Sequence, residues 1–435
     1  MLSLYRYFLI AYSAFLIVAF LIGGIRMDFA PFSYVFVLLA NIYMLVCTKR
    51  NFMLFIVSFI LLFSNYSIIF ANFAGTINEM YTIPLSEESF NISINILTLF
   101  NIIIFFIVGW EKVSPGFNQN VFVDIAKKNT IILYLIYSLL IPIFFLGFTL
   151  PEVEGARGNP SAAYEYSAIL FLLLFYYCGF QKWHIRFGLF LVAVYSIQSL
   201  IFGGRIEAIQ FILVAYMMLF MHKISMKKVM AAIGGMFLLM SLIGVVRGAL
   251  LTGNFEISSL LSLLGERGLA LDTAYSAYYT SESFIYVMDK FTLQEIMVFF
   301  WDFLKSVFIG GDPDMHLTAV SATYVDHSMG GVMPFYFFFY LRVWGVVLSA
   351  IIVALYLNLV NGLTEVASGY VKCLSVWVVC TTFRWYLYTP LPLLRGVLFL
   401  TIAYYAFAYL HYQINRLPIF QSFLYETECS TEMEK

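Results

Sequence analysis

Long, almost uncharged apolar runs dominate this 435-residue sequence and leave it few ways to fold in water. Apolar residues make up 62% of the chain and charged residues only 11%, whereas a soluble domain carries about a quarter charged residues. So few charges cannot cover a water-facing surface of this size. The net charge of -1 and the lack of a basic block also argue against nucleic-acid binding. The composition predicts a polytopic membrane protein.

The apolar runs are continuous rather than alternating, which favours membrane helices over a β-barrel. A helix needs about 20 mostly apolar residues to cross the hydrocarbon core. We therefore predict an all-α fold of about twelve transmembrane helices in a single integral membrane domain, residues 1–435. The predicted spans are 7–24, 32–48, 52–73, 92–109, 131–150, 167–181, 185–202, 206–221, 229–247, 335–357, 370–388 and 396–412. The first span lacks a cleavage box and is predicted to be a retained anchor.

Basic residues in the short loops predict the orientation of these spans, because such residues stay in the cytoplasm. Lysines follow the second, fourth, sixth and eighth spans, at Lys49, Lys112, Lys182 and Lys223. The acidic stretch 78–88 falls on the opposite side. Both termini are thus predicted to be cytoplasmic, with 413–435 as a cytoplasmic tail. The five cysteines lie in spans or on the cytoplasmic side, so no disulfide framework is expected.

One connection is far longer than the others. Residues 248–334 are predicted to form a large outer loop, and loops of this length usually carry function. Within the loop, 294–309 has apolar residues at helical spacing and is predicted to be an interfacial helix that stops at the glycines that follow it. Tyrosines are frequent over 272–286, and two interpretations stay open for them: a membrane-surface belt or a platform that stacks on sugar rings.

Arginines are distributed against the usual bias. In the predicted topology seven of them lie in the outer half of the protein: Arg26, Arg157, Arg205, Arg247, Arg267, Arg384 and Arg395. Three stand beside glycine, in Gly203-Gly204-Arg205, Arg247-Gly248 and Arg267-Gly268. These motifs are compatible with plain helix ends at headgroup level. Because arginine offers a planar fork of donors for phosphate oxygens, they also predict an outward-facing pocket that holds a lipid-linked diphosphate.

A transfer reaction at such a pocket needs a base for the acceptor hydroxyl. Three candidates are His316 and His327 in the long loop and Glu207 inside the eighth span, where Arg205 is the expected partner of the carboxylate. Both histidines are equally compatible with ordinary polar loop residues. The histidine spacing does not fit a metal site, and no nucleotide-binding signature is present. We therefore expect neither a metal nor a cofactor.

The chain resembles the O-antigen (oligosaccharide repeat-unit) polymerases of the Wzy family. The resemblance rests on the number of spans, on the large outer loop in the C-terminal half, and on short motifs. These motifs are Phe202-Gly203-Gly204-Arg205, Arg247-Gly248 and His327-Ser328-Met329-Gly330-Gly331, the last leading into the aromatic run 335–340.

The resemblance implies a metal-independent glycosyltransferase of the bacterial inner membrane, with a GT-C-like fold similar to that of the O-antigen ligases and a periplasmic active site. Such an enzyme transfers a glycan from undecaprenyl diphosphate to a lipid-linked repeat unit, and its partner is a chain-length-regulating co-polymerase of the Wzz type. It also implies that Arg205, Arg247 and Arg267 bind diphosphate, and that His327 acts on the acceptor hydroxyl. Arg157 and Arg384 are further diphosphate candidates.

Three other functions stay open. A flippase or other transporter of lipid-linked oligosaccharides would place its charges near the bilayer midplane and in repeated halves, and no such pairing is visible. An O-antigen ligase would use the same donor chemistry with a different acceptor. A non-catalytic membrane scaffold is the third possibility.

Overall fold

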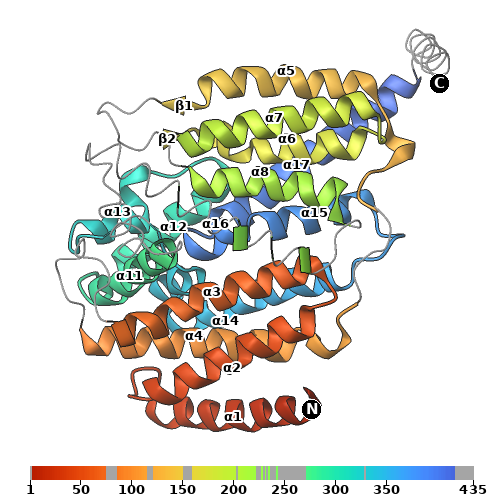
Figure 1. The fold of residues 1–435 in the computed structure, drawn as a ribbon. Helices are drawn as coiled ribbons and strands as arrows, with labels where there is room; N and C mark the ends of the chain where they lie inside the picture. Colours follow the sequence, from red (N-terminus) through yellow and green to blue (C-terminus); the bar gives the residue numbers. More distant parts are fainter. Residues whose placement is uncertain are drawn as a thin grey trace, which may run out of the picture.

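Apolar helices make up nearly all of the regular structure and run roughly side by side (Figure 1). The computed structural model describes residues 2–74, 86–114, 121–149, 159–201, 204–221, 271–327 and 330–416, and also 227–228, 231, 234–235 and 242. The only strands in these ranges are the two-residue β1 (Phe148–Thr149) and β2 (Asn159–Pro160), which pair antiparallel. Short 3-10 turns lie between the helices that end at Ile107 and begin at Thr130, at η1 (Trp110–Lys112) and η2 (Ile125–Lys127), and between those that end at Phe308 and begin at Leu317, at η5 (Pro313–Met315).

The first group of helices is built mostly from the N-terminal part of the chain. It contains α1 (Leu2–Gly23), α2 (Ala30–Thr48), α3 (Phe52–Ala74), α4 (Glu87–Ile107) and α14 (Met333–Asn361). α2 packs against α1, α3 and α4, while α14 packs along α4. A long apolar helix from the C-terminal half thus completes the N-terminal group.

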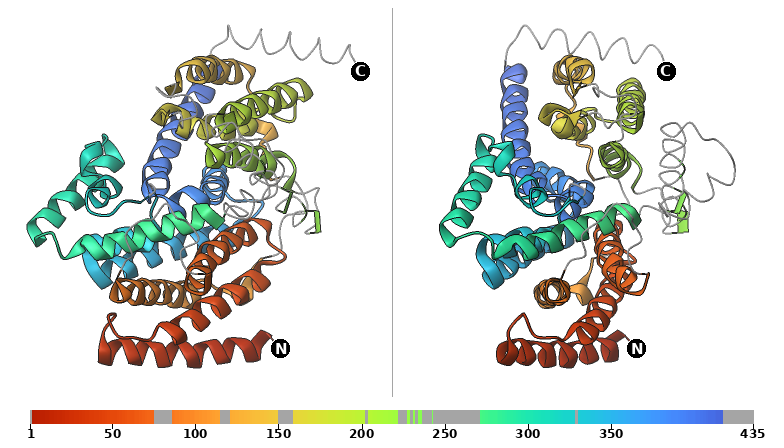
Figure 2. Two further views of the ribbon diagram at one scale, coloured as in Figure 1. Left: turned by 60° about the vertical axis from the view of Figure 1, so that its left-hand side comes forward. Right: turned by 90° about the vertical axis from the view of Figure 1, so that its left-hand side faces the viewer.

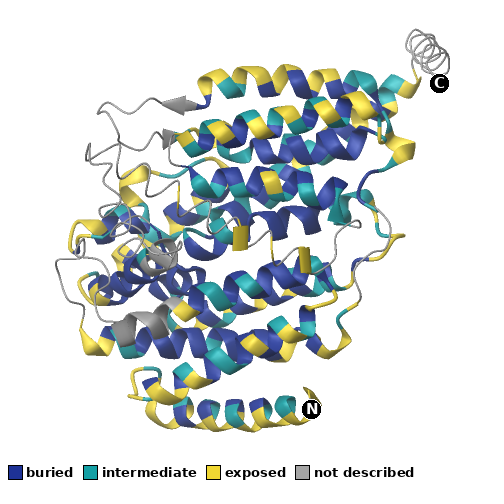
Figure 3. Ribbon diagram, in the orientation of Figure 1, coloured by how far each residue is buried: buried dark blue, intermediate teal, exposed yellow. Residues whose placement is uncertain are grey.

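The second group contains helices from the middle and the C-terminal part of the chain. Its members are α5 (Thr130–Leu146), α6 (Ala162–Tyr177), α7 (Lys182–Ile201), α8 (Arg205–Leu219), α15 (Gly369–Cys380), α16 (Thr382–Leu387) and α17 (Leu391–Arg416). α15 packs against α8 and α17 and also contacts α3 and α14, so it joins the two groups (Figure 2). The outermost helices, α1 and α5, carry many exposed residues, whereas α6 and α15 are largely buried (Figure 3).

Three helices gather at one end of this bundle. They are α11 (Leu271–Met288), α12 (Leu293–Phe308) and α13 (Leu317–Ala322), and in Figure 1 they lie at the end opposite the two chain termini. α11 packs against α3, α4 and α14, and α12 packs against α17 and α14. We call this end of the molecule the α11–α13 end.

The helix predicted over 294–309 is confirmed as α12. A capping box starts it, in which the Thr292 side chain accepts from the Glu295 N–H and the Glu295 carboxylate accepts from the Thr292 N–H. Its polar residues divide: Gln294, Glu295 and Lys305 are exposed, whereas Asp302 is only 8% exposed. Both oxygens of Asp302 accept the N–H of Asp312, at 3.1 and 3.2 Å.

Each predicted span except 229–247 overlaps a described helix, and 229–247 lies mostly outside the described residues. Six helices in the described ranges are long and apolar enough to cross a membrane: α1, α2, α4, α7, α14 and α17. α5, α6 and α15 are apolar but shorter. A helical fold with several helices able to cross a membrane is therefore confirmed, while the count of about twelve crossings and the outer position of 248–334 stay predictions.

Two predicted spans are not continuous helices. The span 370–388 is interrupted at Thr381, where the hydroxyls of Thr381 and Thr382 donate to the carbonyls of Trp377 and Val378 instead of facing solvent. Such bonds to the preceding turn bend helices. The span 335–357 is interrupted at Arg342, whose φ of 55° is not helical.

Two tyrosines of α11 fit neither interpretation of the sequence. Tyr278 and Tyr279 are 2% and 6% exposed, so neither forms a surface belt or a sugar platform, whereas Tyr286 is 36% exposed. The Tyr278 ring packs against Phe90 of α4 and Phe335 of α14, with centroids 6.4 and 6.1 Å away. α11 is thus anchored inside the bundle by its aromatic side chains.

Candidate functional site

A buried ion cluster lies where α6, α8 and α16 meet. The Arg384 guanidinium of α16 donates to Glu207 of α8, with Nη1 2.5 Å from Oε1, and its other nitrogen pairs with Glu165 of α6. The Glu207 side chain is 1% exposed and that of Arg384 14%. One guanidinium therefore faces two carboxylates in a water-poor setting, where such pairs hold their geometry tightly.

The cluster brings together two of the predicted site residues, Arg384 and Glu207, but with a different pairing from the one expected. We expected Arg205 to be the partner of Glu207, and the partner found is Arg384, 177 positions away. Arg205 opens α8, is half-buried, and has no ion pair within the described part of the chain. The Arg205 guanidinium at the start of α8 can therefore bind an anion.

The crowded surroundings of position 204 explain why a glycine precedes Arg205. A Cβ at Gly204 would lie 2.8 Å from a Glu207 carboxylate oxygen and 3.3 Å from the Ser199 carbonyl. The Gly204 N–H also donates to that carbonyl at 2.6 Å. At Gly204 the absence of a side chain therefore makes room for the protein's own Glu207 carboxylate.

His327 lies at the α11–α13 end, held between two hydroxyl groups. Its Nε2 is 2.7 Å from Ser321 Oγ of α13, and its Nδ1 is 3.4 Å from Thr280 Oγ1 of α11. Both hydroxyl-bearing residues are 0% exposed. Each hydroxyl also lies within hydrogen-bond distance of a backbone carbonyl one turn before it, that of Thr318 for Ser321 and that of Ser276 for Thr280. The imidazole ring is thus fixed in orientation by two helices.

The segment after His327 is tied to the helix that carries Arg384. The Gly331 N–H donates to the Tyr388 carbonyl at 2.9 Å, and the Tyr388 N–H donates to the Arg384 carbonyl at 3.0 Å. α16 is fixed in turn by Tyr386, whose hydroxyl donates to Asn65 of α3 at 2.8 Å. The end of α16 therefore connects the histidine-bearing segment to the buried ion cluster.

His316, the other predicted base, is half-buried between η5 and α13. Its Nδ1 is 2.7 Å from Thr318 Oγ1, and its ring meets the edge of Tyr336 with centroids 6.0 Å apart. Burial lowers the pKa of His316, while the nearby Asp302 raises it and Arg395 lowers it. Its carboxylate neighbour is thus Asp302 of α12.

Glu282 of α11 is a buried carboxyl group that the sequence analysis missed. It is 5% exposed and has no ion pair in the described part of the chain. Burial raises the pKa of Glu282 to about 8. The hydroxyl of Tyr34, from α2, is its electrostatic neighbour, and this hydroxyl is buried without a hydrogen-bond partner among the described residues. In the sequence, this buried group could have been suspected from the polar run Thr280-Ser281-Glu282-Ser283.

Three predicted diphosphate ligands, Arg157, Arg247 and Arg267, lie outside the described residues. Within the described ranges no group of three or more histidine, cysteine, aspartate or glutamate side chains is arranged to hold a metal ion. Arg395 lies at the start of α17 and donates to the carbonyl of Ser306, with Nε 2.6 Å from the oxygen, so it attaches α12 to α17.

Comparison with known proteins finds no family model, curated protein or solved structure that matches this chain.

Proposed function

We propose that this chain is a glycosyltransferase that polymerises lipid-linked glycan repeat units at the periplasmic face of a bacterial inner membrane. The observation that carries the proposal is the joining of an oriented histidine, His327, to a buried arginine–carboxylate cluster through the end of α16. The donor would be a growing glycan on undecaprenyl diphosphate, and the acceptor the terminal sugar of a new lipid-linked unit. No metal and no cofactor take part.

In this reaction His327 takes the proton of the acceptor hydroxyl. The acceptor oxygen forms a bond to the anomeric carbon of the donor, and the bond from that carbon to the phosphate oxygen breaks. The electron pair of the broken bond leaves with the undecaprenyl diphosphate. The hydroxyls of Ser321 and Thr280 support the role of His327, because a base must be oriented before it can act efficiently.

Two other groups can act as the base. Arg384 keeps Glu207 in an ion pair, which favours the ionised carboxylate that a base requires. His316 has a lowered pKa, so it is neutral and able to accept a proton near pH 7. Neither is connected to hydroxyl groups of two helices as His327 is.

The leaving diphosphate needs cationic groups that are not already neutralised. Arg205 meets this condition within the described residues, and Arg247, Arg267 and Arg157 are proposed to act with it. Arg384 could bind the diphosphate only by giving up a carboxylate, so we assign it first to positioning Glu207 and Glu165. A co-polymerase of the Wzz type is the proposed partner that sets chain length.

A transporter of lipid-linked oligosaccharides is the second candidate, and one observation favours it. The buried ionisable groups of Arg384, Glu207 and Glu282 lie among membrane helices, and such groups often line transport pathways. An O-antigen ligase shares the proposed chemistry and differs in acceptor.

Deletion of the gene, followed by gel analysis of surface polysaccharide, tests the proposal. A polymerase predicts loss of long chains with single repeat units retained, and complementation by His327→Ala should give the same pattern. His411→Ala is the matched control, because His411 is also a hydrogen-bonded histidine but belongs to the far end of α17. Loss of all repeat units would favour the flippase or the ligase, and long chains with His327→Ala would contradict the assigned base.

A further inference from the structure

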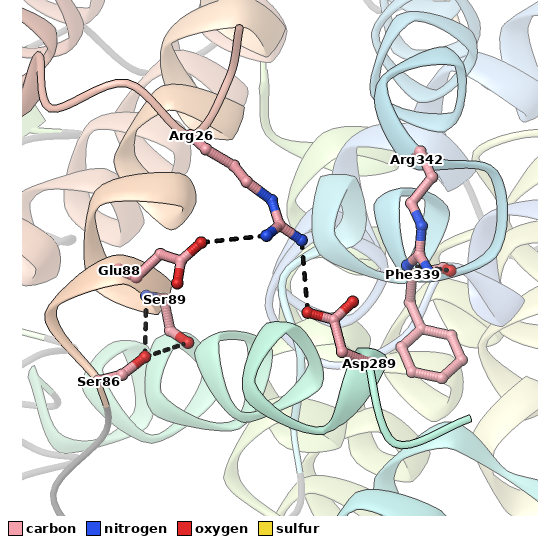
Figure 4. Close-up of polar contacts among 7 residues, drawn as sticks. All are labelled: Arg26, Ser86, Glu88, Ser89, Asp289, Phe339 and Arg342. Atoms are coloured by element: carbon pink, nitrogen blue, oxygen red, sulfur yellow. Dashed lines mark hydrogen bonds and ion pairs between the residues drawn. The ribbon is translucent and has the colours of Figure 1, made fainter. Parts of the chain in front are cut away.

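A second charged cluster lies at the α11–α13 end, apart from the proposed site. Arg26, in the connection after α1, bridges two carboxylates, with nitrogens 3.2 Å from Glu88 of α4 and 3.3 Å from Asp289 at the end of α11 (Figure 4). All three side chains are more than half exposed. Figure 4 places Arg342 of α14 on the other side of Asp289. Cations and carboxylates thus alternate across four segments of the chain.

Arg342 is held there by an unfavourable backbone conformation. Its φ of 55° with ψ of -140° is rare for a residue that has a Cβ. The break brings the two halves of α14 so close that a Cβ on Gly345 would lie 1.8 Å from the Phe337 carbonyl oxygen. Neither proline nor glycine occupies the break itself. Strain of this kind persists where the surroundings fix it, commonly at ligand sites.

The Arg342 guanidinium is poorly satisfied by the protein. Its one hydrogen bond is to the Phe339 carbonyl, at 3.4 Å, and it has no ion pair within the described residues. Its charged neighbours are Asp289, of opposite sign, and Arg26, of the same sign. A half-buried guanidinium with so few partners has donors left for an anion.

An exposed apolar stripe begins next to Arg342 and runs down α14. Its members are Trp344, Leu348, Ile351 and Leu355, which recur at helical spacing and are 78%, 41%, 36% and 61% exposed. From Arg342 to Leu355 the helix rises about 20 Å, which is somewhat more than half of the roughly 30 Å hydrocarbon core. The stripe therefore has the length of one acyl chain, and Trp344 has the place of a headgroup-level anchor.

We propose that this cluster and stripe bind one membrane phospholipid with a zwitterionic phosphoethanolamine headgroup. Arg342, with Arg26 beside it, holds the phosphate. Glu88 and Asp289 hold the ammonium group, which donates three hydrogen bonds where a quaternary amine donates none. The acyl chain lies along Trp344 to Leu355. This inference is independent of the proposed enzymatic function, because it needs only a membrane.

Native mass spectrometry of the purified, delipidated full-length protein tests the site. Phosphatidylethanolamine, phosphatidylcholine and phosphatidylglycerol are added separately, and the retained lipid is measured. Wild-type protein should retain phosphatidylethanolamine about tenfold more strongly than the other two, as expected when one charge-assisted contact is lost. Equal retention of the three lipids would overturn the proposal.

Variants connect the retention to the named residues. Arg342→Gly should weaken retention of all three lipids while keeping the fold, because they share the phosphate and glycine adopts a positive φ without strain. Arg26→Gln leaves the break in α14 unchanged and should weaken retention as well. Glu88→Gln should reduce the preference for phosphatidylethanolamine over the other two lipids. Arg6→Gln, which removes an exposed pair with Glu111 elsewhere in the molecule, is the matched control. Unchanged retention in Arg342→Gly and Arg26→Gln, or an unchanged preference in Glu88→Gln, would contradict the site.

Discussion

At the scale of single residues, Arg384 is the cation on which two buried carboxylates depend. Its ion pairs with Glu165 and Glu207 join three helices that are far apart in sequence. The sequence marked Arg384 and Glu207 as candidates because ionisable residues inside apolar runs are uncommon. It could not pair them, since their contact depends on how α8 and α16 pack.

Removing the Arg384 cation should destabilise the protein strongly. Arg384→Met leaves two carboxylates together without a cation and is expected to cost about 3–5 kcal/mol of the free energy of unfolding. Adding Glu207→Gln to Arg384→Met should restore part of that loss, because the mutual repulsion of the carboxylates is relieved. Thermal unfolding of the purified variants in detergent measures both effects. Equal stability of Arg384→Met and wild type would show that the ion cluster contributes nothing.

Glu282 should make the stability of the protein depend on pH. Its folded-state pKa, about 8, lies above the ordinary value of 4.5, so the folded protein holds a proton that the unfolded chain releases. The contribution of Glu282 to stability is therefore complete below pH 4.5 and is lost as the pH rises to about 8. The pKa difference corresponds to at most roughly 5 kcal/mol.

Glu282→Gln should remove this dependence, because the amide does not titrate. Unfolding temperatures of wild type and variant measured between acidic and mildly alkaline pH are expected to diverge, with the variant the more stable at the alkaline end. Parallel curves for the two proteins would mean that Glu282 is ionised in the folded state.

At the scale of helices, the sequence predicted helix ends better than breaks within helices. The apolar spacing of 294–309 and the glycines that follow Ile309 predicted α12 almost to the residue. The break at Arg342 has no such signal, because a strained φ at an arginine is imposed by packing around it. For the same reason Arg342 is absent from the seven arginines that the predicted topology placed outside.

The attachment of α12 to α17 should depend on Arg395. Arg395→Gln removes a charged donor from the Ser306 carbonyl, and a bond of this kind contributes about 1.5 kcal/mol or more. Hydrogen exchange of the α12 amides should then be about tenfold faster, while exchange in α2, at the other side of the molecule, is unchanged. Lys305→Gln is the control, since it removes an exposed charge from the same helix.

At the scale of the whole molecule, the sequence predicted where helices form but not how they assemble. Because membrane helices satisfy their own backbone hydrogen bonds, long apolar runs located most of the described helices, though not α11 or α13. The insertion of α14 beside α4, and the burial of α11 against α3, depend on contacts between distant segments. The same holds for the candidate site: the sequence predicted several of its residues but not the residues that they contact.

The orientation of the bundle can be tested at its two ends. Ile309, just after α12, is 87% exposed, and Val366, in the connection between α14 and α15, is 94% exposed. Ile309→Cys and Val366→Cys are introduced separately into a chain whose native cysteines are replaced. In cells with a permeable outer membrane, an impermeant thiol reagent should label Ile309→Cys and spare Val366→Cys. The reverse pattern would invert the predicted topology.

The proposed chemistry is tested most directly by purified protein in liposomes that contain undecaprenyl-diphosphate-linked repeat units. The measured quantity is the release of undecaprenyl diphosphate together with lengthening of the lipid-linked glycan. Wild type and the His411→Gln control should give both products without added metal, whereas His327→Gln should lower the rate by about a hundredfold or more. Undiminished product formation by His327→Gln, or movement of the substrate across the bilayer without any glycan lengthening in wild type, would contradict the account.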